Sequence, residues 1–420
     1  MLDIKFIRKN PDIVTKAIED RGVDLNLNDF LTIDKTRSLF IGELEEMKAK
    51  INKSSKEKPD EETIKELQKI KGSIKEKQEE LSGIEEKYQE LMLQIPNIPH
   101  KDMPIGKGED DNVELKRNGD FKEKEWRKDH LEIGEKLDII DVKQSALVTG
   151  SRFSYLKNEA VLIQDALHLM LRDELLKHDF KPMLPPVMVK EQALIGTSHF
   201  PEGKDQIYEI KEDYVEDKNR LYLIGSAEPS LFAYFMNKTI GETPEKMFAL
   251  TSCFRTEVGS WGKDVRGIKR VHQFDKLEMD VVCSPDQSED IFKELLKINE
   301  WFLQSLEIPY RVMNKCSGDA GYIASHLQYD VEAWLPSQEE FMEVMTDTLA
   351  SDFQARRLNI KYKDKSGKKS LAHTVNDTGC AMGRMIIAIL DNHQQKDGSV
   401  KLPKTLTQYT GFKEIPLKSS

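Results

Sequence analysis

The chain has 420 residues, 33% of them charged, and a formal net charge of −11 at pH 7. This length allows two or three domains with a large core, and the acidic balance weighs against nucleic-acid binding over the whole surface. The four cysteines form no CxxC pair, no apolar run of 18 residues occurs and the N-terminus lacks a signal-peptide core, so we expect no zinc or disulfide framework, no membrane span and a cytoplasmic location.

The N-terminal region predicts a helical arm. Residues 1–28 suggest a short helix and a loop, and apolar residues then recur at steps near 3.5 from about 30 to 95, with a polar break at 53–60. Two helices joined by a tight polar turn make an antiparallel coiled-coil hairpin, and ~30 residues in each give an arm of about 45 Å. Because one hairpin buries little, we expect it to contact another molecule; the pattern alone leaves a dimerisation or scaffold role open.

The rest of the chain predicts a mixed fold. Three prolines between residues 96 and 104 mark a linker, since proline cannot continue a helix, and the polar segment 105–150 is expected to be a connector on the next domain. Residues 160–180 and 288–306 each predict one long helix. Apolar strand-like runs return around them without alternating strictly with helices, which favours an antiparallel sheet and an α+β fold.

Residues 254–279, FRTEVGSWGKDVRGIKRVHQFDKLEM, are the most informative stretch, with two strand-like runs around a loop rich in Gly, Lys and Arg. Side chains alternate faces along a strand, so Arg255 and Glu257 share one face, as do Phe274 and Glu278. A hairpin of this kind presents a cation, two carboxylates and an aromatic ring on one face. These groups suit a nucleotide, with guanidinium for phosphate, ring for base and carboxylate for an exocyclic amine. The alternative is a solvated hairpin of mixed charge.

This stretch resembles motif 2 of the class II aminoacyl-tRNA synthetases, in the form found in seryl-tRNA synthetases. The start MLDIKFIRKNPDIV, the Lys/Glu-rich hairpin, motif 1 near Pro185 and motif 3 near Arg384 follow the family's order, so the likeness covers nearly the whole chain. It implies a homodimer with the motif 1 helix at the interface, and tRNA as the partner of the arm. The domains it implies are an N-terminal tRNA-binding domain at 1–100 with its coiled coil at about 30–95, a connector at 101–150, and a class II catalytic domain with an antiparallel β-sheet at 151–420.

The resemblance also implies the ATP contacts. Arg255 would hold the α-phosphate, Glu257 would accept from the adenine amine, Phe274 would stack on the ring, and Arg384 would hold the γ-phosphate; the two arginines are the candidates for catalysis. The loop 258–270 would reach the acceptor end of tRNA through its cations, which are Lys263, Arg266, Lys269 and Arg270. The full set placed against ATP is Arg255, Thr256, Glu257, Phe274, Glu343, Val344, Met345, Thr346 and Arg384.

Two further segments match the family with changes. In Ser226-Ala227-Glu228, period two sets the outer residues on one face; the family's Thr-x-Glu contacts the serine substrate. In the segment 343–346, EVMT, the family's Glu-Ile-Ser-Ser binds Mg²⁺ with ATP, and Glu343 and Thr346 keep the oxygen ligands that a hard cation requires. Residues three apart in a flat strand face opposite ways, so both reach one ion only at a bulge or a strand end.

Serine specificity is expected to come from hydrogen bonds, because a site that pairs the substrate hydroxyl rejects alanine. Four residues depart from the family pattern, namely Ser226, Met345, Leu349 and Asp377. A carboxylate of Asp377 that pointed inward would oppose an anionic substrate. The residues expected to bind serine are Ser226, Ala227, Glu228, Arg255, Glu278 and Thr378.

The resemblance therefore implies a serine–tRNA ligase that uses ATP and Mg²⁺ to form seryl-adenylate and charges tRNA(Ser), and also tRNA(Sec). Three alternatives stay open. One is an amino-acid:carrier-protein ligase, whose relatives typically lack the long arm. Another is a catalytically silent paralogue that acts as a binding protein. The third is a synthetase tuned to resist a serine-mimicking inhibitor.

Overall fold

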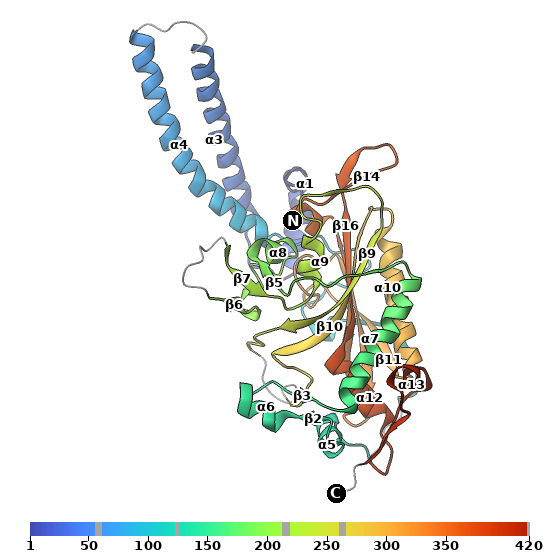
Figure 1. The fold of residues 1–420 in the computed structure, drawn as a ribbon. Helices are drawn as coiled ribbons and strands as arrows, with labels where there is room; N and C mark the ends of the chain where they lie inside the picture. Colours follow the sequence, from blue (N-terminus) through green and yellow to red (C-terminus); the bar gives the residue numbers. More distant parts are fainter. Residues whose placement is uncertain (55–60, 122–125, 212–218, 260–265, 418–420) are drawn as a thin grey trace. The chain divides into compact units, whose positions relative to one another are not determined.

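The computed structural model describes residues 1–54, 61–121, 126–211, 219–259 and 266–417. These residues form two compact units, Met1–Ile98 and Pro99–Ser420 (Figure 1). Among the described residues, no helix is both long enough and apolar enough to cross a lipid bilayer.

The first unit is entirely helical. Its elements are α1 (Ile4–Lys9), α2 (Pro11–Asp20), α3 (Leu27–Ser54) and α4 (Glu61–Gln94). The start of α3 meets the end of α4, since the Phe30 and Tyr88 rings lie 5.2 Å apart and Arg37 lies 3.2 Å from Glu85. This pairing confirms the predicted antiparallel helical hairpin.

Two details of this unit differ from the sequence prediction or lie beyond it. The prediction of a single short helix before the arm is wrong, because Pro11 begins a second helix, where its fixed φ and missing N–H suit the first turn. Residues 55–60, which hold most of the predicted polar turn, lie outside the described residues, and α3 continues through Ser54.

The second unit is built on an eight-stranded sheet in the order β1-β11-β12-β13-β16-β10-β9-β4. Neighbouring strands are antiparallel except for β4 and β9, which confirms the α+β prediction. The strands are β1 (Val113–Asn118), β4 (Lys181–Pro182), β9 (Glu245–Phe254), β10 (Gln273–Cys283), β11 (Tyr310–Asn314), β12 (Leu327–Leu335), β13 (Glu340–Ser351) and β16 (His373–Ala381). All six residues of β1 are exposed, so this edge strand has no buried face, and the segment was predicted only as a connector.

The two faces of the sheet pack against different helices. The long helices α7 (Glu159–Lys177), α10 (Ser288–Ser305) and α12 (Met382–His393) share one large core with Leu277, Met279 and other residues of the sheet (Figure 1). The short helices α9 (Glu228–Ala233) and α11 (Phe353–Leu358) form a second core that includes Val282 of β10. Because side chains alternate along β10, its buried polar residues Lys276, Glu278 and Asp280 lie on the face of the short helices.

The remaining elements are short and surround the sheet. They are η1 (Glu109–Asp111), α5 (His130–Lys136), β2 (Ile140–Asp141), α6 (Val142–Thr149), β3 (Tyr155–Leu156), β5 (Met188–Lys190), α8 (Glu191–Gly196), η2 (Lys204–Gln206), β6 (Glu209–Ile210), β7 (Leu221–Leu223), β8 (Thr239–Ile240), β14 (Lys361–Lys363), β15 (Lys369–Leu371), β17 (Val400–Lys401), α13 (Lys404–Thr410) and β18 (Glu414–Ile415).

Candidate active site

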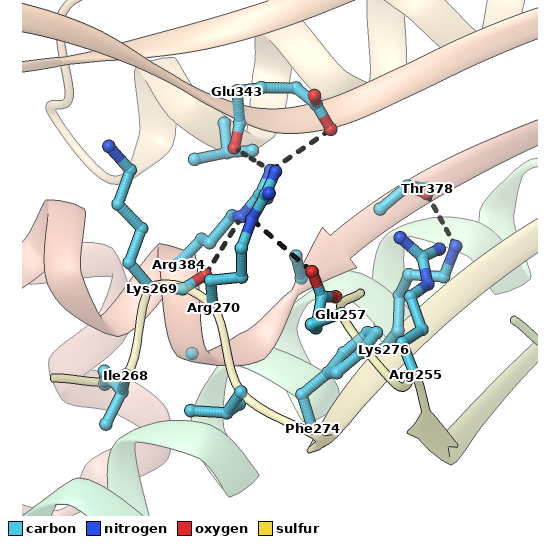
Figure 2. A pocket seen from close by; sticks show the side chains of 14 residues that line it. Arg255, Glu257, Ile268, Lys269, Arg270, Phe274, Lys276, Glu343, Thr378 and Arg384 are labelled. Carbon is cyan, nitrogen blue, oxygen red and sulfur yellow. Dashed lines mark hydrogen bonds and ion pairs between the residues drawn. The ribbon is translucent and has the colours of Figure 1, made fainter. Parts of the chain in front are cut away.

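A pocket of about 580 Å³, open to solvent, lies where β10, β13, β16 and the first turn of α12 converge (Figure 2). Predicted residues from five separate segments line it together, and they are Arg255, Glu257, Phe274, Glu343, Val344, Thr378 and Arg384.

Arg255 is fixed at the floor of the pocket. Its Nε donates to the Gly225 carbonyl oxygen at 3.1 Å, and its guanidinium carbon lies 5.4 Å from the centroid of the Phe274 ring. Anchoring through Nε leaves the two terminal amino groups to form a fork for a phosphate or carboxylate. The side chain is therefore held in place before any ligand arrives.

Glu257 reaches the pocket by a route that strand alternation did not predict. β9 ends at Phe254, and Glu257 has a left-handed φ of 51°, so the prediction that it shares a strand face with Arg255 is wrong. Arg152 donates to the Glu257 carbonyl at 2.8 Å, and the Glu257 carboxylate lies 3.5 Å from Arg270. These contacts hold a backbone conformation that costs a non-glycine residue free energy.

Thr256 does not line the pocket. Its hydroxyl donates to the Asp205 carbonyl oxygen at 2.5 Å, and its N–H donates to the Gln206 carbonyl oxygen at 3.0 Å. The prediction that its side chain contacts ATP is therefore not supported by this geometry.

Arg384 lies in the first turn of α12, opposite Arg255 across the pocket in Figure 2. Its Nη1 donates to the Glu343 carbonyl oxygen at 2.8 Å and to the Glu343 carboxylate at 3.2 Å. Although desolvation opposes ionisation of Glu343, the positive charges of Arg384 and then Lys315 lower the pKa of this carboxyl. The pocket therefore combines the guanidinium groups of Arg255, Arg270 and Arg384 with the ionised carboxylate of Glu343.

A β-bulge brings Glu343 and Thr346 together, as the sequence analysis required. Between β12 and β13, Val331 pairs with Met345 and Glu332 pairs with Glu343. One residue of β13 therefore has no partner on β12. The Thr346 hydroxyl lies 3.4 Å from a Glu343 carboxylate oxygen. A bulge changes the face to which the following side chains point. Met345, which was predicted at the ATP site, is instead fully buried in the helix-side core.

The predicted serine-binding residues form a buried polar cluster. Glu278 accepts from Ser226 Oγ at 2.9 Å and from Lys276 Nζ at 2.6 Å, and Lys276 also donates to Thr378 Oγ1 at 2.9 Å. Glu278 and Lys276 are 3% and 6% exposed, which makes this a buried ion pair. Lys276 was given no role from the sequence, although it shares the strand face of its neighbour Phe274.

The segment from Ser226 to Glu228 is not the strand that period two suggested. Glu228 is the first residue of α9, its N–H donates to Ser226 Oγ at 3.2 Å, and the side chain of Ala227 packs in the core. Gln354 Nε2 donates to Glu228 Oε1 at 2.6 Å. Burial, followed by the neighbouring charge of Glu278, raises the pKa of Glu228 to about 7.

Asp377 points away from the pocket. Its carboxylate is fully buried on the helix side, where Asn299 Nδ2 of α10 donates to Asp377 Oδ2 at 2.8 Å and to Asp347 Oδ1 at 2.9 Å. Burial raises the pKa of Asp377 to about 7. The concern that this carboxylate would oppose an anionic substrate is therefore not borne out.

The cations predicted to meet tRNA have protein partners where they are described. Arg266 lies 3.3 Å from Asp129, Lys269 lies 3.3 Å from Glu340, and Arg270 lies near Glu257. Lys263 falls within 260–265, outside the described residues.

Comparison with known proteins places this geometry in a family. Residues 1–99 match the seryl-tRNA synthetase N-terminal domain, and residues 208–393 match the class II tRNA synthetase core domain. Proteins named serine–tRNA ligase from Rubrobacter xylanophilus and Borreliella afzelii are each 39% identical to this chain, covering 99% and 100% of both sequences, respectively. The crystal structure of seryl-tRNA synthetase from Pyrococcus horikoshii complexed with ATP has a TM-score of 0.90 at 36% identity. That of the cytoplasmic serine–tRNA ligase from Naegleria fowleri in complex with AMP has a TM-score of 0.86 at 30% identity, and both cover this chain completely.

Proposed function

This chain belongs to the seryl-tRNA synthetase family, and we propose that it activates L-serine with ATP to seryl-adenylate and transfers the seryl group to the 3′ end of tRNA(Ser), and of tRNA(Sec). The observation that carries the proposal is the convergence of Arg255, Phe274 and Arg384 on one pocket directly beside the buried cluster of Glu278 and Thr378. The first group suits a nucleoside triphosphate, and the second suits a small hydroxy amino acid.

The first step joins the two substrates. A serine carboxylate oxygen attacks the α-phosphorus of ATP, the P–O bond to the β-phosphate breaks, and pyrophosphate leaves. Arg255 would hold the α-phosphate and the serine carboxylate, where negative charge gathers, while Glu257 and Phe274 hold the adenine. The protein supplies positioning and preorganised charge and forms no covalent bond.

The second step uses tRNA. The 3′-terminal ribose hydroxyl attacks the activated carbonyl carbon, the bond to the phosphate oxygen breaks, and AMP leaves. The hydroxyl proton departs with a phosphate oxygen or with water, so we assign no protein base. Glu278 and Thr378 would keep the serine hydroxyl bound through both steps.

The chemistry of two residues fits a magnesium ion bound with ATP. Glu343 supplies an ionised carboxylate, and the bulge places Thr346 Oγ1 3.4 Å from it. Two hard oxygen ligands therefore lie close enough to bind the same cation. The Thr346 hydroxyl also donates to Asp330 at 3.0 Å, which leaves its lone pairs for a cation. When bound, the ion would neutralise charge on the phosphate oxygens. No group of three acidic, His or Cys side chains suited to a metal exists among the described residues, so phosphate would complete the coordination.

The partners follow from two surfaces. We propose that the α3–α4 hairpin binds the body and long variable arm of tRNA, because a two-helix arm has little core of its own. We also propose a homodimer through α7, where Val161, Leu162 and Leu176 are 41%, 47% and 50% exposed. Burial of these side chains against a second copy would remove apolar surface from water. The proposed site of action is the cytoplasm.

Two assays test the proposal. Serine-dependent exchange of pyrophosphate into ATP measures the first step, and charging of tRNA(Ser) measures both. Arg255→Ala should reduce the exchange rate about 10²–10³-fold, because it removes a charge stabiliser of the transition state. Absence of exchange with any amino acid would favour the silent paralogue. Exchange without tRNA charging would favour the carrier-protein ligase. Neither alternative is favoured by relatives that match over their full length.

A further inference from the structure

We propose that Gln354, oriented by Thr374, is the positioning residue that prepares Glu228 to bind the ammonium group of the amino-acid substrate. This inference rests on the proposed function and adds two residues to the machinery that selects an amine. Neither residue lines the pocket: Gln354 is 2% exposed in α11, and Thr374 is fully buried in β16.

Glu228 and Glu278 lie side by side but have different partners. Glu278 already has a cation, since Lys276 Nζ lies 2.6 Å from its carboxylate. Glu228 has none within contact among the described residues. The nearest basic group is His199 Nε2 at 3.9 Å, and burial lowers the pKa of this imidazole to about 3, so it is neutral. A cation that enters the site is therefore drawn to Glu228.

Gln354 donates a hydrogen bond to Glu228 but carries no charge of its own. Its Nε2 donates to Glu228 Oε1 at 2.6 Å, and the Asn376 amide adds a second hydrogen bond to the same carboxylate. An amide fixes the position of a carboxylate without cancelling its charge, whereas a lysine or arginine at this place would cancel it. The negative charge of Glu228 thus stays available for the substrate.

The orientation of the Gln354 amide is set by three partners. Thr374 Oγ1 donates to Gln354 Oε1 at 2.7 Å, while Gln354 Nε2 faces two acceptors, Glu228 Oε1 and the Thr197 carbonyl oxygen at 3.1 Å. Reversing the amide would place its oxygen against both acceptors. The hydrogen bond from Thr374 secures the orientation in which Gln354 donates.

The test is steady-state pyrophosphate exchange with Gln354→Met, which keeps the side-chain volume and removes the donor. The Michaelis constant for serine should rise about tenfold, which corresponds to about 1.4 kcal/mol, while that for ATP stays within twofold. Thr374→Val should raise the constant for serine by a smaller factor. Thr374→Ser keeps the hydroxyl and should restore the wild-type value.

A second readout separates positioning from general damage. Inhibition by 3-hydroxypropanoate, which has the carboxylate and hydroxyl of serine but no ammonium group, should be unchanged in Gln354→Met. The inference is overturned if both substitutions leave the serine constant within twofold of wild type. It is also overturned if the constants for serine, ATP and the analogue all weaken together. If Gln354→Met does not fold, the Thr374 pair decides by the same criteria. A wild-type protein with no serine-dependent exchange would instead reject the proposed function.

Discussion

Lys276 and Glu278 form a buried ion pair in the proposed serine site, and Lys276→Met tests its contribution to stability. Lys276 Nζ lies 2.6 Å from Glu278 Oε2, with both side chains almost completely buried. Removing one partner of such a pair typically costs about 3–5 kcal/mol, because the other charge stays buried without compensation. The substitution keeps the apolar length of the side chain, so the loss should come from the charge.

Proton uptake limits this cost. At pH 7, protonating an ordinary glutamic acid with a pKa of about 4.3 costs about 3.7 kcal/mol, because the pH lies ~2.7 units above that pKa. The variant can always remove its uncompensated charge in this way, so we expect a loss of about 3–4 kcal/mol in the free energy of unfolding at pH 7. The loss should shrink by about 1.4 kcal/mol for each unit that the pH falls.

The assay is urea unfolding of wild type, Lys276→Met, Glu278→Gln and the double variant, followed by fluorescence at pH 5, 6 and 7. The double variant should recover most of the loss, since a neutral amide then faces a neutral side chain. Equal stability of Lys276→Met and wild type at pH 7 would refute the reasoning. A loss that does not depend on pH would refute it as well, because packing and not charge would then explain it.

Three further predictions concern the substrates and the assembly. Because the pKa of Glu228 is raised to about 7, the contribution of this one group to stability falls as the pH rises from about 4.5 to 7. Binding of an ammonium group favours the ionised form, so the Michaelis constant for serine should fall as pH rises from 6 to 8, and Glu228→Gln should remove this dependence. Deleting residues 35–90 should abolish charging of tRNA and leave pyrophosphate exchange unchanged, and normal charging would contradict the proposed role of the arm. The double variant Leu162→Glu with Leu176→Glu should sediment as a monomer in analytical ultracentrifugation if α7 forms the dimer interface, whereas wild type should sediment as a dimer.

The sequence predicted those parts of the fold in which apolar residues recur at regular spacing. The spacing of apolar residues gave the helical hairpin and the long helices α7 and α10, and the two strand-like runs flanking the loop gave β9 and β10. Strand β1 was not predicted, because apolar and polar residues alternate only over its first four positions and the rest of the strand is charged or polar. The assumption that side chains alternate with a period of two residues was also wrong just beyond the strand ends. There Glu257 adopts a left-handed φ and Glu228 begins a helix.

The candidate site was predictable to the extent that its residues lie on one strand face or match the family. The requirement that both oxygens meet one ion predicted a bulge or a strand end at Glu343 and Thr346, and the structure has a bulge there. The contact of Gln354 with Glu228 could not be predicted, because it joins residues 126 positions apart and no local pattern encodes such a pairing. Lys276 lies two residues from both Phe274 and Glu278, so strand alternation places all three side chains on one face. The sequence could therefore have predicted a cation beside the Glu278 carboxylate.

The four departures from the family pattern carry less weight against catalysis than the sequence suggested. Met345 and Leu349 are buried in the core that the sheet shares with the long helices, and the carboxylate of Asp377 points to the same side. A substitution on that face changes packing beneath the sheet and leaves the groups in the pocket in place. Only Ser226 lies in the predicted serine site, where its hydroxyl donates to Glu278 at 2.9 Å as a threonine could. A silent paralogue would need its losses among the groups proposed to bind ATP and serine, and three of the four departures lie elsewhere.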